Sequence, residues 1–182
     1  QKYASDGERI LCHISNFRPV KRVDDVLRIF AKVNAVLPSK LILVGDGPDR
    51  YHCERLCREL NLCDEVIFLG KVRDTSHVLE MADVFLLPSE TESFGLAALE
   101  AMAVGVPVIS SNTGGIPEVN IHGYSGYLSD VGDIDDMAKN TLELLKPENH
   151  PTFKKQAKLR SEEFSLARIL PMYEELYRNL VK

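Results

Sequence analysis

Short, wholly apolar runs that alternate with amphipathic stretches constrain the fold of this chain more than any other feature. Strands built almost entirely from apolar residues are covered on both faces, as in parallel sheets. Their alternation with helices predicts parallel pairing through right-handed crossovers. We therefore predict an α/β domain with a Rossmann-like, doubly wound parallel sheet of about six strands. The expected strands are Ile10–Ile14, Leu41–Val44, Val66–Leu69, Val84–Leu87, Val106–Ile109 and Gly126–Leu128.

The remaining segments favour helices and a single domain. Between the strands, apolar residues recur at helical spacing. The 182 residues suit one domain of ordinary size, so we expect residues 1–182 to form one unit. The chain enters its first strand almost at once and has no signal peptide, so we expect a piece of a longer protein. The expected helices are 24–36, 49–61, 75–81, 95–104, 134–145, 149–164 and 166–181.

Composition excludes several classes of function. The net charge of −5 argues against a basic surface that would bind nucleic acid or an anionic membrane. No apolar run approaches the roughly 18 residues that suggest a membrane span, so we expect no integral membrane segment. The four cysteines lack the spacing of a metal site, so we expect no metal, and reduced thiols in a cytoplasmic protein. They are Cys12, Cys53, Cys57 and Cys63.

The segment after the first strand carries three cations. Arg18, Lys21 and Arg22 lie within five residues, before a predicted helix. Cations at this edge of a sheet are suited to a phosphate. A solvated basic turn explains the same pattern, and the residues alone leave both interpretations open.

The segment after the second strand contains two glycines. Gly45 and Gly47 resemble half of a dinucleotide fingerprint, but the third glycine is missing and Pro48 removes an amide donor. A turn from strand to helix needs glycines in any case. The pattern therefore argues against a standard NAD site.

The acidic loop after the fourth strand is the most informative segment. The helix expected to begin near Gly95 presents amides without intrahelical partners, which suit a phosphate. Glu92 lies just before this helix and Glu100 lies within it. The two carboxylates could accept hydrogen bonds from the hydroxyl groups of a sugar and of a ribose. A helix-capping acid and a surface acid account for the same spacing equally well.

Glu92-x7-Glu100, with Ser93-Phe94-Gly95 inside it, is similar to the E-x7-E motif of retaining glycosyltransferases. These are the enzymes of family four, which have two Rossmann-like domains (the GT-B fold). The resemblance covers nearly the whole chain and implies one half of a GT-B fold. Further matching segments are Phe68–Gly70, Ala82–Ser89, Gly105–Ile109 and Gly114–Glu118.

The resemblance also implies roles for single residues. Glu92 would accept hydrogen bonds from donor-sugar hydroxyls, and Glu100 from the ribose. Lys21 matches the lysine that neutralises the diphosphate, while Asn16 stands where many members have arginine, so Arg18 or Arg22 would supply the second cation. We assign catalytic roles to Glu92, Lys21 and Arg18. The remaining donor-binding positions are Ser93, Phe94, Gly95 and Leu96 at the helix terminus, and Gly45, Gly47, Gly70, Lys71 and Val72 near the base.

The run Ser15–Arg22 resembles the corresponding segment in one subgroup of this family. The enzymes of that subgroup transfer N-acetylglucosamine from UDP-N-acetylglucosamine to L-malate, the first step of bacillithiol synthesis. For this chain the resemblance implies a UDP-sugar as ligand, no cofactor and no required metal. The small acceptor would bind an amino-terminal domain outside the chain, so this piece alone would turn over little. Residues 165–182 would pack toward that domain. Homo-oligomerisation of the full-length protein stays open.

Three other functions remain compatible with the sequence. They are a family-four hexosyltransferase with a polysaccharide, lipid or glycan acceptor, a UDP-sugar epimerase of the same architecture, and a non-catalytic UDP-sugar-binding module. The histidines are not catalytic candidates: we expect His13 in the core and His52, His77, His122 and His150 at the surface or in turns. The pairs Asp24-Asp25 and Asp135-Asp136 are expected to be solvated or to cap helices.

Overall fold

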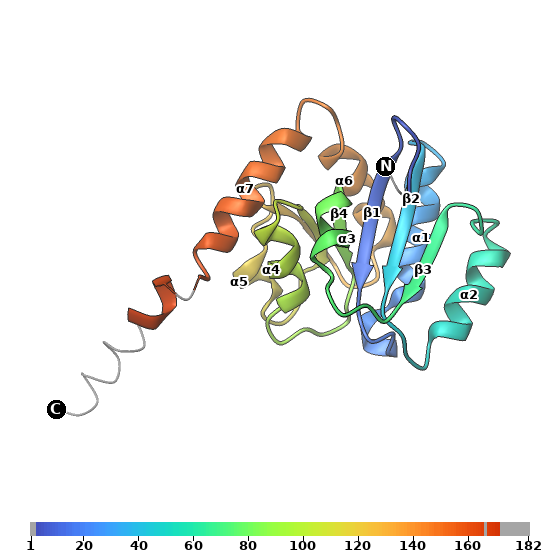
Figure 1. Ribbon diagram of the computed structural model, residues 1–182, viewed down its shortest axis with the longest axis horizontal. Helices are drawn as coiled ribbons and strands as arrows, with labels where there is room; N and C mark the ends of the chain where they lie inside the picture. Colours follow the sequence, from blue (N-terminus) through green and yellow to red (C-terminus); the bar gives the residue numbers. More distant parts are fainter. Residues whose placement is uncertain (1–2, 166, 172–182) are drawn as a thin grey trace.

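The computed structural model describes residues 3–165 and 167–171, and its centre is one six-stranded parallel sheet. The strand order is β3-β2-β1-β4-β5-β6. After β1 the chain adds β2 and β3 on one side, and then returns to add β4, β5 and β6 on the other side, so the strand order reverses between β1 and β4. All pairs are parallel, and the carboxyl ends of the strands therefore lie at one edge (Figure 1). The predicted doubly wound fold is confirmed. The strands are β1 (Arg9–Ile14), β2 (Ser39–Val44), β3 (Val66–Gly70), β4 (Val84–Leu87), β5 (Val108–Ser111) and β6 (Gly126–Ser129).

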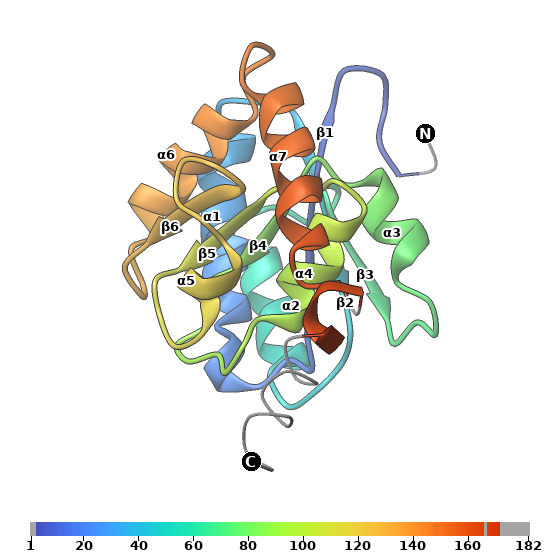
Figure 2. The ribbon, with the colours of Figure 1, turned by 90° about the vertical axis from the view of Figure 1, so that its left-hand side faces the viewer.

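Helices cover both faces of the sheet (Figures 1 and 2). On one face lie α1 (Val23–Asn34), α2 (Arg50–Glu59) and α6 (Ile134–Leu144); on the other lie α3 (Ser76–Met81), α4 (Leu96–Ala103), α5 (Ile116–Val119) and α7 (His150–Glu162). Residues at helical spacing, such as Val26, Phe30 and Val33 of α1, are fully buried against the sheet. Successive strand residues point to opposite faces and feed two separate apolar clusters, as with Leu11 and Cys12.

Two details differ from the sequence prediction. The fifth strand begins at Val108 rather than Val106, because Pro107 has no N–H for the ladder and contributes only its carbonyl, which accepts the Phe85 N–H at 2.9 Å. The short helix α5 was not predicted. The expected helix 166–181 falls largely on residues outside the described part of the chain, and so does its predicted packing on another domain.

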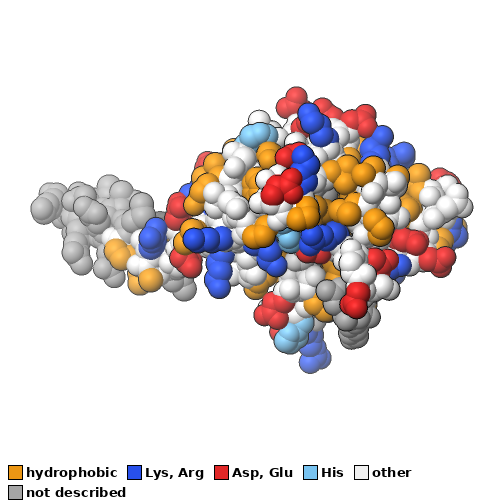
Figure 3. Space-filling view, turned by 90° about the horizontal axis from the view of Figure 1, so that it is seen from above, with side chains coloured by type: hydrophobic (Ala, Val, Ile, Leu, Met, Phe, Trp, Pro, Cys, Tyr) orange, Lys and Arg blue, Asp and Glu red, His pale blue; other side chains and the backbone are white. Residues whose placement is uncertain are grey.

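The described surface mixes both signs of charge. On the face seen in Figure 3, acidic and basic side chains are interspersed. Within residues 3–165 and 167–171, no helix is long and apolar enough to cross a membrane. The same residues contain no group of three or more His, Cys, Asp or Glu side chains placed to hold a metal ion.

Candidate functional site

A cleft of about 320 Å³ lies at the carboxyl edge of the sheet, where the strand order reverses. The ends of β1 and β4 and the first residues of α4 form its walls. Open α/β sheets bind their ligands in such a crevice outside the carboxyl ends of the strands. The cleft is lined by Ile14, Ser15, Asn16, Lys21, Leu87, Glu92, Gly95, Leu96, Ala97 and Glu100.

The cleft brings together six of the fifteen predicted site residues. These are Asn16, Lys21, Glu92, Gly95, Leu96 and Glu100. The others lie on neighbouring loops and do not line it: Arg18, Arg22, Gly45, Gly47, Gly70, Lys71, Val72, Ser93 and Phe94.

Lys21 and Glu92 form an ion pair inside the cleft. The Lys21 Nζ donates to Glu92 Oε2 at 2.6 Å, and the two side chains are only 21% and 15% exposed. Lys21 ends a 3-10 turn (Pro19–Lys21), and a backbone bond from Glu90 N–H to the Val20 carbonyl at 2.8 Å runs beside the pair. The loops that follow β1 and β4 are thus joined by a charged and a neutral contact.

Two adjacent glycines hold the loop that carries Glu92. The Gly115 N–H donates to the Glu92 carbonyl at 2.9 Å. A Cβ atom at Gly114 would lie 2.0 Å from the Glu92 carbonyl oxygen, and one at Gly115 would lie 2.1 Å from that of Ser93. Only glycine therefore allows this approach. In the sequence the pair counted only as part of a family motif, although two glycines directly after a strand signal close backbone packing.

The amino terminus of α4 faces the cleft. Gly95 precedes the helix with φ 86° and ψ 45°, a left-handed conformation that favours glycine. The first amides of the helix have no intrahelical acceptors and carry the positive end of the helix dipole. Phe94 turns away from the cleft lining and packs edge-to-face on Phe164, with ring centroids 5.7 Å apart. Glu100, within α4, is exposed along the same cleft.

Gly45 and Gly47 have a structural explanation that requires no ligand. A Cβ atom at Gly45 would lie 1.7 Å from the Ser15 carbonyl oxygen, and one at Gly47 would lie 1.9 Å from that of Asn16. These glycines let the loop after β2 pack against the loop after β1. The Gly45 N–H also donates to the Gly70 carbonyl at 2.8 Å, which links the tips of β2 and β3.

A buried histidine fixes the first loop of the cleft. His13 is fully buried, and burial is the main reason that its pKa falls to about 4. The ring is therefore neutral near pH 7: Nδ1–H donates to the Leu86 carbonyl at 2.8 Å, and Nε2 accepts the Ser15 hydroxyl at 2.8 Å. Ser15 Oγ in turn accepts the Phe17 N–H at 3.3 Å. The predicted core position is confirmed, but its support of the cleft loop was missed.

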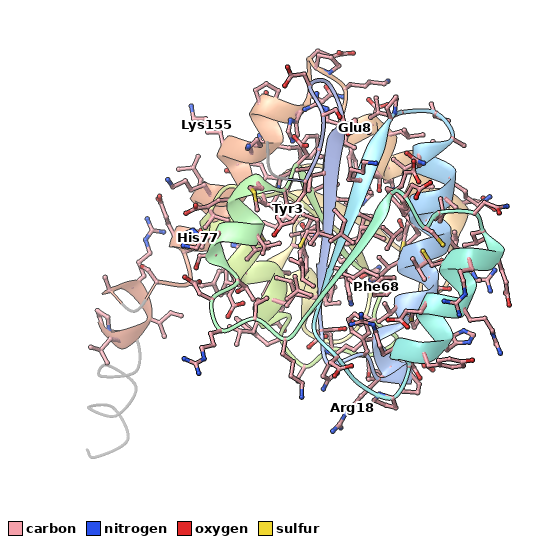
Figure 4. All side chains as sticks on the ribbon, turned by 45° about the vertical axis from the view of Figure 1, so that its right-hand side comes forward. Tyr3, Glu8, Arg18, Phe68, His77 and Lys155 are labelled. Carbon is pink, nitrogen blue, oxygen red and sulfur yellow. The ribbon has the colours of Figure 1, made fainter. Side chains whose placement is uncertain are left out.

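The two candidate arginines have different surroundings. Arg22 donates from Nε to Asp25 Oδ2 at 2.6 Å, and this hydrogen bond raises the pKa of Arg22. Asp25 is only 3% exposed, so the expectation that it is solvated is wrong. Burial raises the pKa of Asp25, and the Arg22 bond opposes this shift. Arg18 is exposed, points into solvent (Figure 4), and has no ion-pair partner among the described residues.

The opposite edge of the sheet holds another polar cluster. Asp83 accepts hydrogen bonds from Arg9 Nη1 at 3.1 Å and from the Ile10 N–H at 2.8 Å. His150 is buried, and its Nε2 lies 2.9 Å from the Asp83 carbonyl oxygen, so the prediction of a surface position is wrong for this histidine. Burial lowers the pKa of His150. The cluster ties α7 to the amino ends of β1 and β4, away from the cleft.

Comparison with known families identifies the chain. Residues 1–162 match the family model described as "Glycosyl transferases group 1". The chain belongs to this family of glycosyl transferases. Proteins similar to it include N-acetyl-alpha-D-glucosaminyl L-malate synthase of Bacillus anthracis, 46% identical over 98% of this chain and 47% of that protein. The D-inositol 3-phosphate glycosyltransferase of Mycolicibacterium smegmatis is 36% identical over 78% of this chain and 33% of that protein.

Solved transferase structures share the fold. A TarM variant from S. aureus, crystallised with UDP, alpha-GlcNAc-glycerol and fondaparinux, superimposes with a TM-score of 0.87, 26% identity, and coverage of 94% of this chain and 36% of that one. Sucrose-phosphate synthase of Thermosynechococcus elongatus superimposes with a TM-score of 0.84 and 31% identity. The match covers 96% of this chain and 46% of that one. The sheet matches the carboxyl-terminal halves of GT-B transferases. The chain spans about a third to a half of the curated relatives it matches.

Proposed function

We propose that this chain is the donor-binding domain of a retaining glycosyltransferase and that its cleft holds a UDP-sugar. The observation that carries the proposal is the Lys21–Glu92 pair, placed in the cleft at the switch point beside the amino terminus of α4. A cation and free helix amides suit a diphosphate, and a neighbouring carboxylate suits sugar hydroxyls. Family membership and the UDP present in the TarM complex support the same assignment.

The proposed chemistry stabilises the leaving group. As the bond between the sugar and the diphosphate breaks, negative charge develops on UDP. Lys21 and the amides at the start of α4 would stabilise that charge. Arg18 would supply a second cation by turning toward the bound diphosphate, because Arg22 is held by Asp25. Cations of this kind can take the place of a metal ion.

The two carboxylates would divide the donor between them. Glu92 would accept hydrogen bonds from hydroxyls of the transferred sugar, and Glu100 from the ribose. A diphosphate that binds Lys21 must draw this cation away from Glu92, to which it is bonded at 2.6 Å. A complete UDP-sugar offers Glu92 new donors in exchange, whereas UDP alone leaves the carboxylate facing another anion. Glu92 would therefore favour donor over product.

The tips of β2 and β3 would receive the base. Gly45 and Gly70 are joined by a backbone hydrogen bond, and Lys71 and Val72 follow directly. They lie at the same carboxyl edge as the cleft, next to the loop that carries Asn16. The nucleotide would thus extend from α4, across the end of β1, toward β3.

We further propose that the complete enzyme transfers N-acetylglucosamine from UDP-N-acetylglucosamine to L-malate. The support is the 46% identity to the Bacillus anthracis synthase, in a match that covers 98% of this chain and so includes the loop from Ser15 to Arg22. The acceptor and further catalytic groups would come from a second domain of the longer protein.

Product analysis on the longer protein that contains this chain tests the proposal. Incubation with UDP-N-acetylglucosamine and L-malate should yield α-linked N-acetylglucosaminyl malate, as judged by the anomeric proton coupling. Lys21→Met should abolish the product, whereas Lys32→Met, which removes an exposed ion-paired lysine on α1, should not. A free epimerised UDP-sugar, an inverted product, or transfer to other acceptors but not to malate would contradict it.

A further inference from the structure

Two of the four cysteines lie side by side at a place remote from the cleft. Helix α2 ends in a Schellman turn: the Leu62 N–H donates to the Cys57 carbonyl at 2.9 Å, and the Asn61 N–H donates to the Arg58 carbonyl at 3.0 Å. Asn61 adopts the left-handed conformation that this motif requires, with φ 56°. The turn reverses the chain and brings Cys63 back alongside Cys57.

The two thiols are neighbours at one hollow of the surface. Cys63 lies close enough to Cys57 to help raise the pKa of the Cys57 thiol. Cys63 is exposed, whereas Cys57 is only 3% exposed. Both line a hollow of about 210 Å³ between α2 and β3, where Phe68 also lies (Figure 4). Its remaining lining residues are Glu54, Arg58 and Val66. A reagent of a few atoms can therefore enter the hollow that both cysteines line, where Cys63 is the exposed one.

The other two cysteines have different surroundings. Cys12 lies in β1 and Cys53 lies in α2, and both are fully buried. Burial raises the pKa of each thiol to about 12. Because the thiolate is the reactive form, these two side chains should stay reduced under conditions that oxidise an exposed thiol. They are internal controls.

We propose that Cys57 and Cys63 form a redox-active dithiol, which a hydroperoxide converts into an intramolecular disulfide. The exposed Cys63 thiolate attacks the terminal oxygen of the hydroperoxide, the O–O bond breaks, and water or an alcohol leaves with a proton. The Cys57 sulfur then attacks the resulting sulfenic acid at sulfur and releases water. The two thiols lose two electrons in total, and the hydroperoxide gains them.

The surroundings assign the order of these steps. Burial is the main reason that the pKa of the Cys57 thiol rises to about 11, and Cys63 adds to the shift. The Arg58 cation lowers this pKa and the Glu65 carboxylate raises it. Cys57 is thus the poorer first nucleophile, and its place in the same hollow as Cys63 suits it to resolve the sulfenic acid.

The proposed cross-link does not depend on the donor site. Cys63 precedes β3, so the pair lies at the amino edge of the sheet, opposite the cleft. A disulfide here would restrain the connection between α2 and β3 and oppose its unfolding. We expect oxidation to raise the midpoint of urea unfolding and to leave the affinity for UDP unchanged.

Peptide mapping tests the proposal on the whole chain. After brief hydrogen peroxide treatment and alkylation in denaturant, the free thiols should fall from the four of the sequence to two. Trypsin cuts at Arg58, so the non-reduced digest should contain 56–58 joined to 59–71, and dithiothreitol should release them. Cys63→Ser should abolish this species. The control Cys53→Ser, on the helix that carries Cys57, should retain it.

Three outcomes would overturn the proposal. The first is oxidation of Cys63 to sulfinic or sulfonic acid while Cys57 remains alkylatable. The second is a disulfide between two chains. The third is that Cys63 stays reduced while the buried cysteines oxidise. Wild-type mapping alone distinguishes these results, so the proposal stays testable even if the serine variants fold poorly.

Discussion

Gly115→Ala is a sharp test of how the loop carrying Glu92 is held. The new Cβ would lie 2.1 Å from the Ser93 carbonyl oxygen, whereas real Cβ atoms almost never come within 3.0 Å, so the loop must shift by about 0.9 Å. Gly115 has φ −84°, so alanine adds no backbone strain and the effect is steric. Displacements near 1 Å can cost up to about 100-fold in a positioned site. We expect at least tenfold weaker binding of UDP-N-acetylglucosamine in isothermal titration.

Gly123→Ala is the matched control. Gly123 has φ 74° but has no atoms within 4 Å of a new Cβ, so alanine there costs about 1 kcal/mol in left-handed strain without moving the cleft. Urea unfolding should show that both variants are folded and moderately destabilised. A folded Gly115→Ala protein with wild-type donor affinity, or an equal loss of affinity in Gly123→Ala, would refute the reasoning.

Three further outcomes follow from the contacts at the cleft. Glu92→Gln should bind UDP about fivefold more tightly, because binding no longer breaks the pairing of Lys21 with Glu92, which contributes roughly 1 kcal/mol. The same variant should bind UDP-N-acetylglucosamine more weakly. Equal shifts in affinity for both ligands in calorimetry would contradict this. Lys21→Met should weaken both ligands more than tenfold, while Lys32→Met should change neither. Burial holds the pKa of His13 at about 4 in the folded protein, against 6.5 in the unfolded chain. The unfolded chain therefore takes up the proton first. The free energy of unfolding should fall by about 3 kcal/mol as the pH drops from 6.5 to 4. Urea titrations should show a shallower pH dependence for His13→Asn; identical slopes would show that His13 does not contribute.

The architecture was predictable because it depends on local patterns. Wholly apolar runs required a sheet covered on both faces, and their alternation with helices required parallel strands. Parallel strands then placed Lys21 and Glu92 at one edge, although they are 71 residues apart in the sequence. Their direct bond was not predictable, because periodicity places a residue on an edge and does not select its partner.

The errors share one physical cause, which is that tertiary contacts decide what polar residues do. Asp25 looked solvated, but it is buried in the first turn of α1 and Arg22 lies against it. His150 looked like a surface residue, but α7 folds it onto Asp83. The close packing of Gly45 and Gly47 against the loop after β1 was likewise not predictable, because a strand pattern does not select the neighbouring loop.

Backbone amide shifts during titration with UDP-N-acetylglucosamine test the central claim most directly. We expect saturable shifts in ¹H–¹⁵N spectra at Gly95, Leu96 and Asn16, with smaller ones at Gly45 and Gly70. No shifts are expected in the groove between α1 and α6 near Lys32. The same titration on Lys21→Met should lose the shifts at the start of α4. Absence of shifts at millimolar ligand, or saturable shifts confined to another surface, would contradict the assignment of the cleft.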